Sequence, residues 1–372
     1  MKKILILHSE YRNLGGEDIA VKNEINLLKK HFEVKTFITS NKIQNIFHLK
    51  NIKIKKVILE FKPDIIYIHN LWFALGLGIF NLLKNKDFQV LIKFHNFRYY
   101  CTSSWFVKKH LNGSLICPAC GLNYKKGSIF NKYFPNSYIK SIYANYFGSR
   151  FFNIILSFNF KILVLTNFHK QFLVKLGVDP NKIFLLHNYI EFKSNGKNSQ
   201  KDDYFIYAGR ISHEKGIEEL ILAHNLSKVN NIKLKIVGTG PALSYLRKIF
   251  KDYNVEFLGP KSNSDVINLI QNSKAVLTAT KLYEGQPTLL CEASKMSVPS
   301  VFPQTGGISE FFPENYPFTF EQYNYLDLKN KINLLIDQKK LNKISKQNFN
   351  FINGLLCEEK IVEEFSKVIN DE

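Results

Sequence analysis

Short apolar runs rich in β-branched residues alternate with longer amphipathic stretches along most of the chain. Near-continuous hydrophobicity over four to seven residues is typical of strands buried on both faces of a parallel sheet. In the first half such runs occupy 2–8, 33–39, 65–70 and 90–96. Between the first two, residues 17–31 place apolar side chains at close to helical spacing, so the order strand, turn and helix predicts an α/β fold.

The same alternation resumes after a polar stretch at 191–203 that has no apolar periodicity and is typical of an interdomain linker. Further strand-like runs, each followed by a helical pattern, lie at 204–209, 233–238, 255–259, 275–279 and 300–302. We therefore expect two doubly wound, Rossmann-like α/β domains facing a cleft, over 1–195 and 196–372. The last helix is expected to pack back on the N-terminal domain. Ligands should bind beyond the carboxyl ends of the strands.

Composition and charge narrow the class of protein. The 372 residues are 45% hydrophobic, as in globular proteins, and 51 Lys and Arg against 31 Asp and Glu give a net charge of +20. This excess favours an anionic partner such as a nucleotide, a phospholipid surface or a nucleic acid, although a Lys-rich codon bias at neutral surface positions would also produce part of it.

No apolar segment has the length of a membrane span. The N-terminal run Ile4 to Leu7 is too short for a secretory signal, and the stretches 71–83 and 151–160 fall short of the roughly 20 residues a spanning helix needs. Five cysteines, an odd number, suit a reducing compartment. We expect a cytoplasmic protein that can contact a membrane only at the membrane surface.

Motifs for the commonest nucleotide sites are missing from the sequence. No Gly-x-Gly-x-x-Gly follows the first strand, and the chain has no P-loop motif. Gly15 and Gly16 precede the first helix instead. They allow a phosphate or sugar to approach the backbone, or they serve only as a structural turn.

Two segments of the second half follow strands and carry candidate ligand groups. In "GRISHEKG", Arg210 and Lys215 would direct two cations toward a diphosphate, whose oxygens gain charge as a sugar–phosphate bond breaks. In "VGTGP", Gly238 and Gly240 form a turn that can lie beside a nucleotide base. Taken singly, Arg210 is as easily explained as a surface residue.

A third segment, 282–295, carries Glu284 and Glu292 across a predicted helix start at Pro287 or Thr288. Free N–H groups at that start would face phosphates. Because carboxylates repel phosphate, hydroxyls are the expected partners, a ribose diol for Glu292 and sugar hydroxyls for Glu284. The residues expected to line the donor site at this helix start are Gln286, Pro287, Thr288 and Leu289.

"GRISHEKG", "VGTGP" and "EGQPTLLCEA", in this order and spacing, look like the donor-binding domain of the retaining nucleotide-sugar glycosyltransferases of the GT-B fold, family four. The resemblance implies that Arg210 and Lys215 bind the diphosphate, Glu284 the donor sugar and Glu292 the ribose. "TGGISEFF" is similar to the family's GGxxE loop and adds Gly306, Gly307 and Glu310 as candidates. Gln286 departs from the family, which usually has an aromatic or aliphatic residue at that position.

The first half resembles the same family more loosely, through "GGEDIAVKNEINLL", "PDIIYIHNLW" and "FHNFRYYC". The resemblance implies that the domain 1–195 binds the acceptor and the domain 196–372 binds the nucleotide sugar. His95, at a predicted strand end, matches the histidine that often borders the reacting sugar. An isolated histidine there would more often be a hydrogen-bonded core residue. The segments 165–178 and 187–190 are similar to the family's last strand and helix before the linker.

Three cysteines cluster in an insertion at 101–120. Cys101, Cys117 and Cys120, with His110 as a fourth ligand, would suit a structural zinc, but a second Cys-x-x-Cys is missing and a buried thiol cluster is the alternative. No catalytic metal is expected. The resemblance implies that Arg and Lys replace it at the diphosphate, and no Asp-x-Asp follows a strand.

The segment 125–161 mixes aromatic residues with Lys and Arg and is nearly free of acids. Such segments lie on anionic membrane surfaces, where lipid-linked acceptors are found. The equally weighted alternative is that the aromatic side chains are core and the cations are solvated.

Together these features predict a retaining glycosyltransferase. It would move a sugar from a UDP- or GDP-sugar to a glycan or polyprenyl-linked glycan, as in capsule or lipopolysaccharide synthesis. Two alternatives stay open: a sugar-nucleotide epimerase of the same fold, and a basic nucleic-acid-binding protein. The cations are scattered rather than concentrated on a recognisable nucleic-acid motif, so we expect no nucleic-acid partner.

Overall fold

The computed structural model describes residues 1–10, 15–40, 49–71, 75–84, 88–97, 99, 115–119, 121–122, 132–134, 136–191 and 202–370. The chain divides into two compact units. Unit 1 comprises Met1–His110, Gly127–Glu191 and Leu356–Glu372, and unit 2 comprises Leu111–Lys126 and Phe192–Leu355. The predicted boundary at 195/196 lies outside the described residues, and the assignment of acceptor and donor roles to the two halves stays a prediction.

The described part of unit 1 contains a six-stranded parallel sheet in the order β2-β1-β3-β4-β5-β6. Its strands are Lys3–Glu10 (β1), Glu33–Ser40 (β2), Ile65–Ile68 (β3), Gln89–Phe94 (β4), Lys161–Val164 (β5) and Ile183–Leu185 (β6). Ile4 to Leu7 and Ile65 to Ile68 are at most 1% exposed, as expected of strands covered on both faces.

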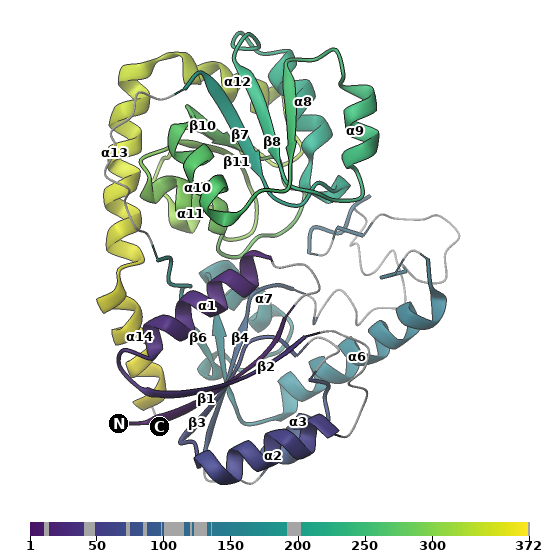
Figure 1. Ribbon diagram of the computed structural model, residues 1–372, viewed down its shortest axis with the longest axis vertical. Helices are drawn as coiled ribbons and strands as arrows, with labels where there is room; N and C mark the ends of the chain where they lie inside the picture. Colours follow the sequence, from purple (N-terminus) through teal and green to yellow (C-terminus); the bar gives the residue numbers. More distant parts are fainter. Residues whose placement is uncertain are drawn as a thin grey trace. The chain divides into compact units, whose positions relative to one another are not determined.

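Helices cover both faces of this sheet. They are Gly16–Leu28 (α1), Leu49–Phe61 (α2), Ile79–Leu83 (α3), Tyr138–Ser157 (α6), Asn167–Lys175 (α7) and Glu358–Asn370 (α14). Figure 1 shows α2 and α3 on one face and α1 on the other. The helix α14, from the far end of the chain, belongs to unit 1, where the Phe365 ring packs 5.5 Å from the Tyr67 ring of β3.

A buried ion pair ties α1 to the sheet. The Lys93 ammonium of β4, 0% exposed, lies 2.8 Å from the Glu24 carboxylate of α1, which also accepts a 2.6 Å hydrogen bond from the Tyr67 hydroxyl. A buried charge is tolerated only when it is paired and hydrogen-bonded. Through these two contacts, Glu24 fixes the position of α1 against β3 and β4.

In unit 2, the described residues form a second six-stranded parallel sheet in the order β12-β11-β10-β7-β8-β9. Its strands are Tyr204–Ala208 (β7), Lys233–Val237 (β8), Val255–Gly259 (β9), Ala275–Leu277 (β10), Ser300–Gln304 (β11) and Thr319–Glu321 (β12). The chain adds β8 and β9 on one side of β7 and then β10, β11 and β12 on the other side, so the strand order reverses between β7 and β10. A ligand is therefore expected at the carboxyl ends of these two strands.

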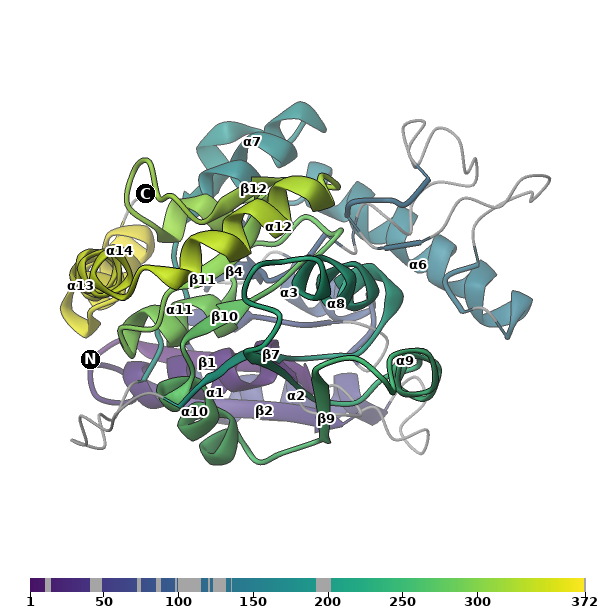
Figure 2. The ribbon, with the colours of Figure 1, turned by 90° about the horizontal axis from the view of Figure 1, so that it is seen from above.

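The helices of unit 2 are Ile217–Asn225 (α8), Leu243–Ile249 (α9), Asn263–Asn272 (α10), Thr288–Lys295 (α11), Tyr325–Asn333 (α12) and Gln338–Leu355 (α13). α8 packs against α12, while α11 packs against α10 and α13 (Figure 2). Short 3-10 helices span His213–Lys215 (η2) and Ile308–Phe311 (η3). Among the described residues, no helix is both long and apolar enough to cross a membrane.

The predicted α/β architecture of two doubly wound domains is confirmed by these two parallel sheets. Observed strands end earlier than the predicted runs at 65–70 and 275–279, because the last two residues of each run belong to the loop beyond the sheet edge. Those loop residues include part of the candidate site.

Candidate functional site

The residues predicted to bind a donor follow the strands at the carboxyl edge of the unit 2 sheet. Arg210 lies two residues after β7, and Lys215 ends η2 just before α8. Glu284 lies in the loop between β10 and α11. β7 and β10 are hydrogen-bonded neighbours, so the two loops meet.

Lys215 and Glu284 form an ion pair. The Lys215 Nζ lies 2.5 Å from the Glu284 Oε1, which also accepts a hydrogen bond of 3.0 Å from the Thr280 hydroxyl. The two side chains are 24% and 26% exposed, so the pair is reachable from solvent yet partly desolvated. Sequence reasoning placed both residues in the site without predicting that they pair.

Arg210 forms a second ion pair, with Glu214. The arginine side chain is 59% exposed, whereas that of Glu214 is 15% exposed, so Glu214 is the fixed partner. The backbone of Arg210 is also fixed, because its carbonyl accepts a hydrogen bond of 3.0 Å from the Tyr207 hydroxyl. Burial, helped by the nearby Glu284 carboxylate, raises the pKa of Tyr207 far above its usual range, which keeps this donor protonated.

Gly238 and Gly240 lie where loops pack backbone against backbone. A Cβ at Gly238 would lie 1.9 Å from the Gly209 carbonyl oxygen, and one at Gly240 would lie 2.1 Å from the Ile211 carbonyl oxygen. Only glycine fits at such distances. Packing against the "GRIS" loop is therefore a reason for these glycines in itself, and their contact with a nucleotide base stays a prediction.

The helix α11 begins at Thr288, with Pro287 as its N-cap, as the sequence predicted. Gln286 is 8% exposed, Leu289 lies in the first turn, and Glu292 lies more than one turn inside. The Glu292 carboxylate accepts no hydrogen bond from the residues that the structure describes, and burial raises the pKa of its carboxyl to about 7. A partly buried carboxylate with no donor among the described residues is suited to a ligand hydroxyl.

The Gly306–Gly307 turn contacts the backbone of the loop that carries Glu284. The Gly307 amide donates to the Glu284 carbonyl at 2.9 Å, and a Cβ at Gly306 (φ +57°) would lie 2.3 Å from that same oxygen. Glu310 follows in η3. The similarity to the family's GGxxE loop thus corresponds to a contact that fixes Glu284.

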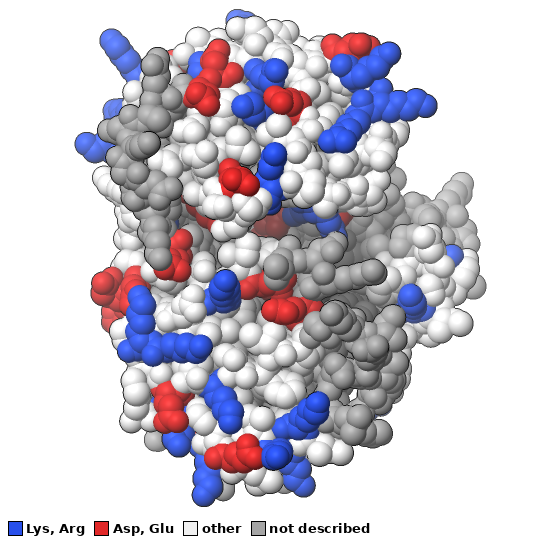
Figure 3. Space-filling model, viewed as in Figure 1, with Lys and Arg blue, Asp and Glu red and all other residues white. Residues whose placement is uncertain are grey.

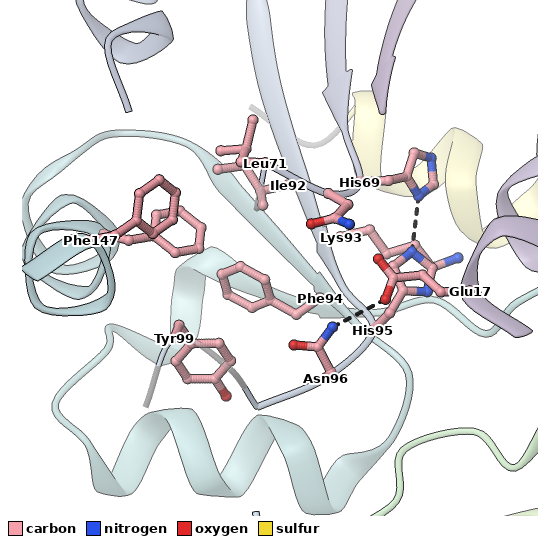
Figure 4. Close-up of a pocket in the computed structure, with 12 residues that line it drawn as sticks. Glu17, His69, Leu71, Ile92, Lys93, Phe94, His95, Asn96, Tyr99 and Phe147 are labelled. Atoms are coloured by element: carbon pink, nitrogen blue, oxygen red, sulfur yellow. Dashed lines mark hydrogen bonds between the residues drawn. The ribbon is translucent and has the colours of Figure 1, made fainter. Parts of the chain in front are cut away.

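In unit 1 a pocket opens at the carboxyl ends of β3 and β4 (Figure 4). His95 directly follows β4, and its Nε2 lies 3.0 Å from the Nδ1 of His69, which directly follows β3. One of these nitrogens donates and the other accepts. The remaining ring nitrogens, His95 Nδ1 and His69 Nε2, are buried and have no hydrogen-bond partner among the described residues. Burial lowers the pKa of both histidines well below the usual value, so both are neutral at neutral pH.

Glu17 and Asn96 border the same pocket, with the Asn96 amide 3.1 Å from the Glu17 carboxylate (Figure 4). The opposite wall is aromatic and consists of Phe94, Tyr99, Phe147 and Phe151. One wall of the cavity is therefore polar and the other aromatic, and its volume is about 40 Å³.

Gly15 and Gly16 open the helix α1, beside Glu17. The Asp18 carboxylate accepts a hydrogen bond of 2.9 Å from the Gly15 amide and contacts the His8 ring at 3.0 Å. The pair therefore forms a capped helix start at the carboxyl edge of β1. Ligand contact by either glycine stays a prediction.

The cysteine cluster is only partly described. Cys101, Cys120 and His110 lie outside the described residues, while Cys117 is buried, with 1% of its surface exposed. Among described residues, no group of three or more His, Cys, Asp or Glu side chains could hold a metal. The structural zinc stays a prediction.

Sequence reasoning missed four residues at these sites: Glu214, Thr280, His69 and Glu17. His69 had a usable signal, since it is a polar residue directly after a buried strand, as His95 is. Glu214 and Thr280 had none, because their roles depend on partners that only the fold brings near.

Two parallel α/β sheets with charged groups at the carboxyl edge of one of them define the class, which is the GT-B fold. Solved structures of that fold match the whole chain. HepE from Anabaena, solved in complex with UDP and glucose, aligns with a TM-score of 0.70 over 100% of both chains at 14% identity. Sucrose-phosphate synthase from Thermosynechococcus elongatus aligns with a TM-score of 0.72 over 100% of this chain and 98% of that one, also at 14% identity.

Residues 189–351 match the family model described as glycosyl transferases group 1, so this part of the chain is similar to that family. The O-antigen biosynthesis glycosyltransferase WbnH of Escherichia coli is 29% identical over 153 residues, 39% of this chain and 42% of the relative. The amylovoran biosynthesis glycosyltransferase AmsD of Erwinia amylovora is 27% identical over 193 residues, 49% of this chain and 54% of the relative. This chain thus spans about half the length of the curated relatives it matches.

Proposed function

We propose that this protein is a retaining, metal-independent glycosyltransferase. It moves a sugar from a nucleoside diphosphate sugar to a hydroxyl of a glycan or lipid-linked glycan. The observation that carries the proposal is the meeting of Arg210, Lys215 and Glu284 at the carboxyl edge of β7 and β10, within a glycosyl transferases group 1 domain. The UDP and glucose in the HepE structure support a nucleotide-sugar donor.

The two cations are the groups that would bind the donor diphosphate. Each is now paired with a carboxylate, Arg210 with Glu214 and Lys215 with Glu284. At an effective dielectric near 20, each close cation–phosphate contact is worth roughly 4 kcal/mol, so a diphosphate competes well for both. Its arrival would free the Glu284 carboxylate to accept hydrogen bonds from the donor sugar.

In the proposed step the acceptor oxygen bonds to the anomeric carbon on the face from which the diphosphate departs. The bond between that carbon and the diphosphate oxygen breaks, and the acceptor proton passes to a phosphate oxygen. Arg210 and Lys215 neutralise the charge that builds on the leaving group, the role taken by a metal ion in other transferases. This transfer does not use the pair of carboxylates that flanks the glycosidic bond in glycosidases and catalyses its hydrolysis.

The unit 1 pocket is proposed to receive the acceptor. His95 offers a neutral ring nitrogen and Glu17 a carboxylate to a hydroxyl of the acceptor, and the aromatic wall includes Tyr99 and Phe147. Burial keeps His95 neutral, so it would contact a hydroxyl as a neutral imidazole rather than as a cation.

The helix α6 is proposed to lie on an anionic membrane surface, which would place the enzyme at the cytoplasmic face, where lipid-linked acceptors occur. One side of the helix is exposed and apolar: Tyr138, Ile139, Ile142, Tyr143 and Tyr146 are 40% to 82% exposed. The helix carries Lys140 and Arg150 and no acidic residue. Its opposite side, including Phe147 and Phe151, lines the proposed acceptor pocket.

The biosynthetic role is proposed to be surface polysaccharide assembly. The relatives act, by their names, in O-antigen, amylovoran and capsular polysaccharide biosynthesis. Nucleic-acid binding has no comparable support. On the face drawn in Figure 3, Lys and Arg are interspersed with Asp and Glu over the described surface rather than gathered in a stripe.

A thermal-shift screen tests the donor assignment. UDP, GDP, ADP, CMP and their common sugar conjugates are added to purified protein, and one diphosphate and its sugar conjugate should raise the melting temperature. Folded protein that responds to none of them would contradict the proposal. Sugar release or isomerisation without an acceptor would favour the epimerase instead.

A further inference from the structure

A short turn from the first half of the chain belongs to unit 2. It comprises the described residues Cys117–Ala119, Gly121 and Leu122, within the segment Leu111–Lys126 that groups with that unit. The Cys117 amide donates to the Leu122 carbonyl at 3.0 Å, and the Gly121 amide donates to the Cys117 carbonyl at 2.8 Å. Cys117 is 1% exposed, so this 117–122 turn is packed into the unit.

The 117–122 turn contacts the loop that leads to Glu284. The Tyr283 amide donates a hydrogen bond to the Pro118 carbonyl. On the same side, a Cβ built at Gly121 would lie 3.0 Å from the Leu282 Cδ2. The turn therefore meets two consecutive residues of the loop, one through its backbone and one through packing.

The turn also contacts the partner of Arg210. A Cβ at Gly121 would lie 2.5 Å from the Glu214 Cβ and 2.7 Å from its Cγ, and Gly121 has a φ of +71°. Glycine is thus required there twice, by the left-handed backbone and by the approach of Glu214.

Glu214 and the Glu284 loop are themselves joined. The Lys281 amide donates to the Glu214 carbonyl at 2.9 Å. Through its carboxylate Glu214 holds Arg210, while Glu284 holds Lys215. One turn therefore supports both carboxylates that position the two candidate phosphate-binding cations.

We propose that the 117–122 turn is a positioning element of the donor site. It sets the places of Glu214 and of the Tyr283–Glu284 backbone, and through them the places of Arg210 and Lys215. The inference rests on the proposed function, because it assigns the turn to the nucleotide-binding step. An insertion in the first half of the sequence thus controls how tightly the second half binds a nucleoside diphosphate.

The test is Gly121→Ala, with Gly76→Ala as its matched control. Gly76 has the same φ of +71°, and a Cβ there would meet nothing within 4 Å. Both variants impose the same left-handed strain, but only Gly121→Ala displaces Glu214 and Leu282. UDP binding is measured by titration calorimetry, and thermal unfolding reports the fold.

We expect Gly121→Ala to weaken UDP binding about tenfold or more, and Gly76→Ala to leave it within about twofold, at similar melting temperatures. Leu282→Ala, which loosens the same contact without backbone strain, should weaken binding in the same direction. It provides the measurement should Gly121→Ala fail to fold. Wild-type affinity in the folded variants would overturn the inference and leave the proposed function standing. If the wild-type protein binds neither UDP nor GDP, both fall.

Discussion

At the residue scale, the charged side chains of the candidate donor site are held by ion pairs and hydrogen bonds. Lys215 is fixed by Glu284, and Glu284 is fixed in turn by the Thr280 hydroxyl and the Gly307 amide. Catalytic groups act efficiently when their partners hold them in place before the substrate arrives. The sequence motif predicted which charged residues lie in the site, and these contacts hold the side chains of Lys215 and Glu284 in fixed orientations.

Replacing Lys215 with alanine should lower turnover of a nucleotide-sugar donor by roughly 10²–10³, because one stabilising contact to the departing diphosphate is lost. Arg210→Ala should act in the same direction. Lys233→Ala is the control, since Lys233 begins β8 at the opposite end of the strand and is 50% exposed. The measurement is the initial rate of sugar transfer at saturating donor. Near-normal turnover in Lys215→Ala would contradict the phosphate-binding role of Lys215.

Glu292 should make nucleotide binding depend on pH. Burial raises the pKa of its carboxyl to about 7, so the carboxylate that we propose accepts two ribose hydrogen bonds is lost as the pH falls below that value. Affinity for UDP should therefore increase between pH 6 and pH 8, as about one proton is released. Glu292→Gln should bind more weakly and without this pH dependence; an unchanged pH profile in that variant would assign the titration to another group.

At the element scale, α6 faces two environments. Phe147, Phe151 and Ile155 are buried against unit 1, while Ile139 and Tyr146 on the other side are 82% and 55% exposed. Exposed apolar residues that recur at helical spacing beside Lys and Arg are typical of helices that lie in a membrane interface. The alternative that every aromatic residue of 125–161 is core does not hold for this exposed side of α6.

Vesicle flotation provides the test of α6. Wild-type protein should float with vesicles that contain anionic lipid, and less with neutral vesicles or at high salt, because screening weakens the attraction. The double variant Ile139→Ser, Tyr146→Ser should bind several-fold less. Leu226→Ser, at a 70% exposed apolar position in unit 2, serves as the control. Binding that ignores lipid charge would remove the membrane proposal.

At the scale of the whole molecule, the two units should respond differently to acid. Unit 1 buries several neutral histidines: burial lowers the pKa of His169 to about 3 and of His187 to about 4, and lowers those of His69 and His95 well below the usual value. In unit 2, burial lowers the pKa of His224 but raises that of Glu292, and these two shifts oppose each other.

Unit 1 should therefore lose stability first as the pH falls. A histidine whose pKa is depressed in the folded state binds protons mainly in the unfolded state, so its contribution to folding is complete above pH 6.5 and declines below it. The raised pKa of Glu364 works in the opposite direction but is a single group. Hydrogen exchange between pH 7 and pH 4 should show opening of β4, β5 and α7 before β7 and β8. Opening in the reverse order would contradict this expectation.

The sequence by itself determined much of the architecture. Apolar runs such as 2–8 and 233–238 fixed the strands β1 and β8, because burial on both faces of a parallel sheet demands unbroken hydrophobicity. The positions of Arg210, Lys215 and Glu284 after strands, and the start of α11 at Thr288, also followed from local pattern and motif. The strands β5, β6 and β12, each of three or four residues, were not predicted, because so few residues carry no readable period.

Only the tertiary structure decided which groups are partners. Glu284 and Lys215 are 69 residues apart in sequence, and His69 and His95 are 26 apart. Their contacts arise because β7 pairs with β10 and β3 with β4, so that loops at the same sheet edge meet. The same holds for the 117–122 turn, whose contact with Glu214 no local pattern announces. Local pattern fixes elements through burial and backbone preference, whereas site geometry depends on strand order, which brings distant loops within hydrogen-bond reach.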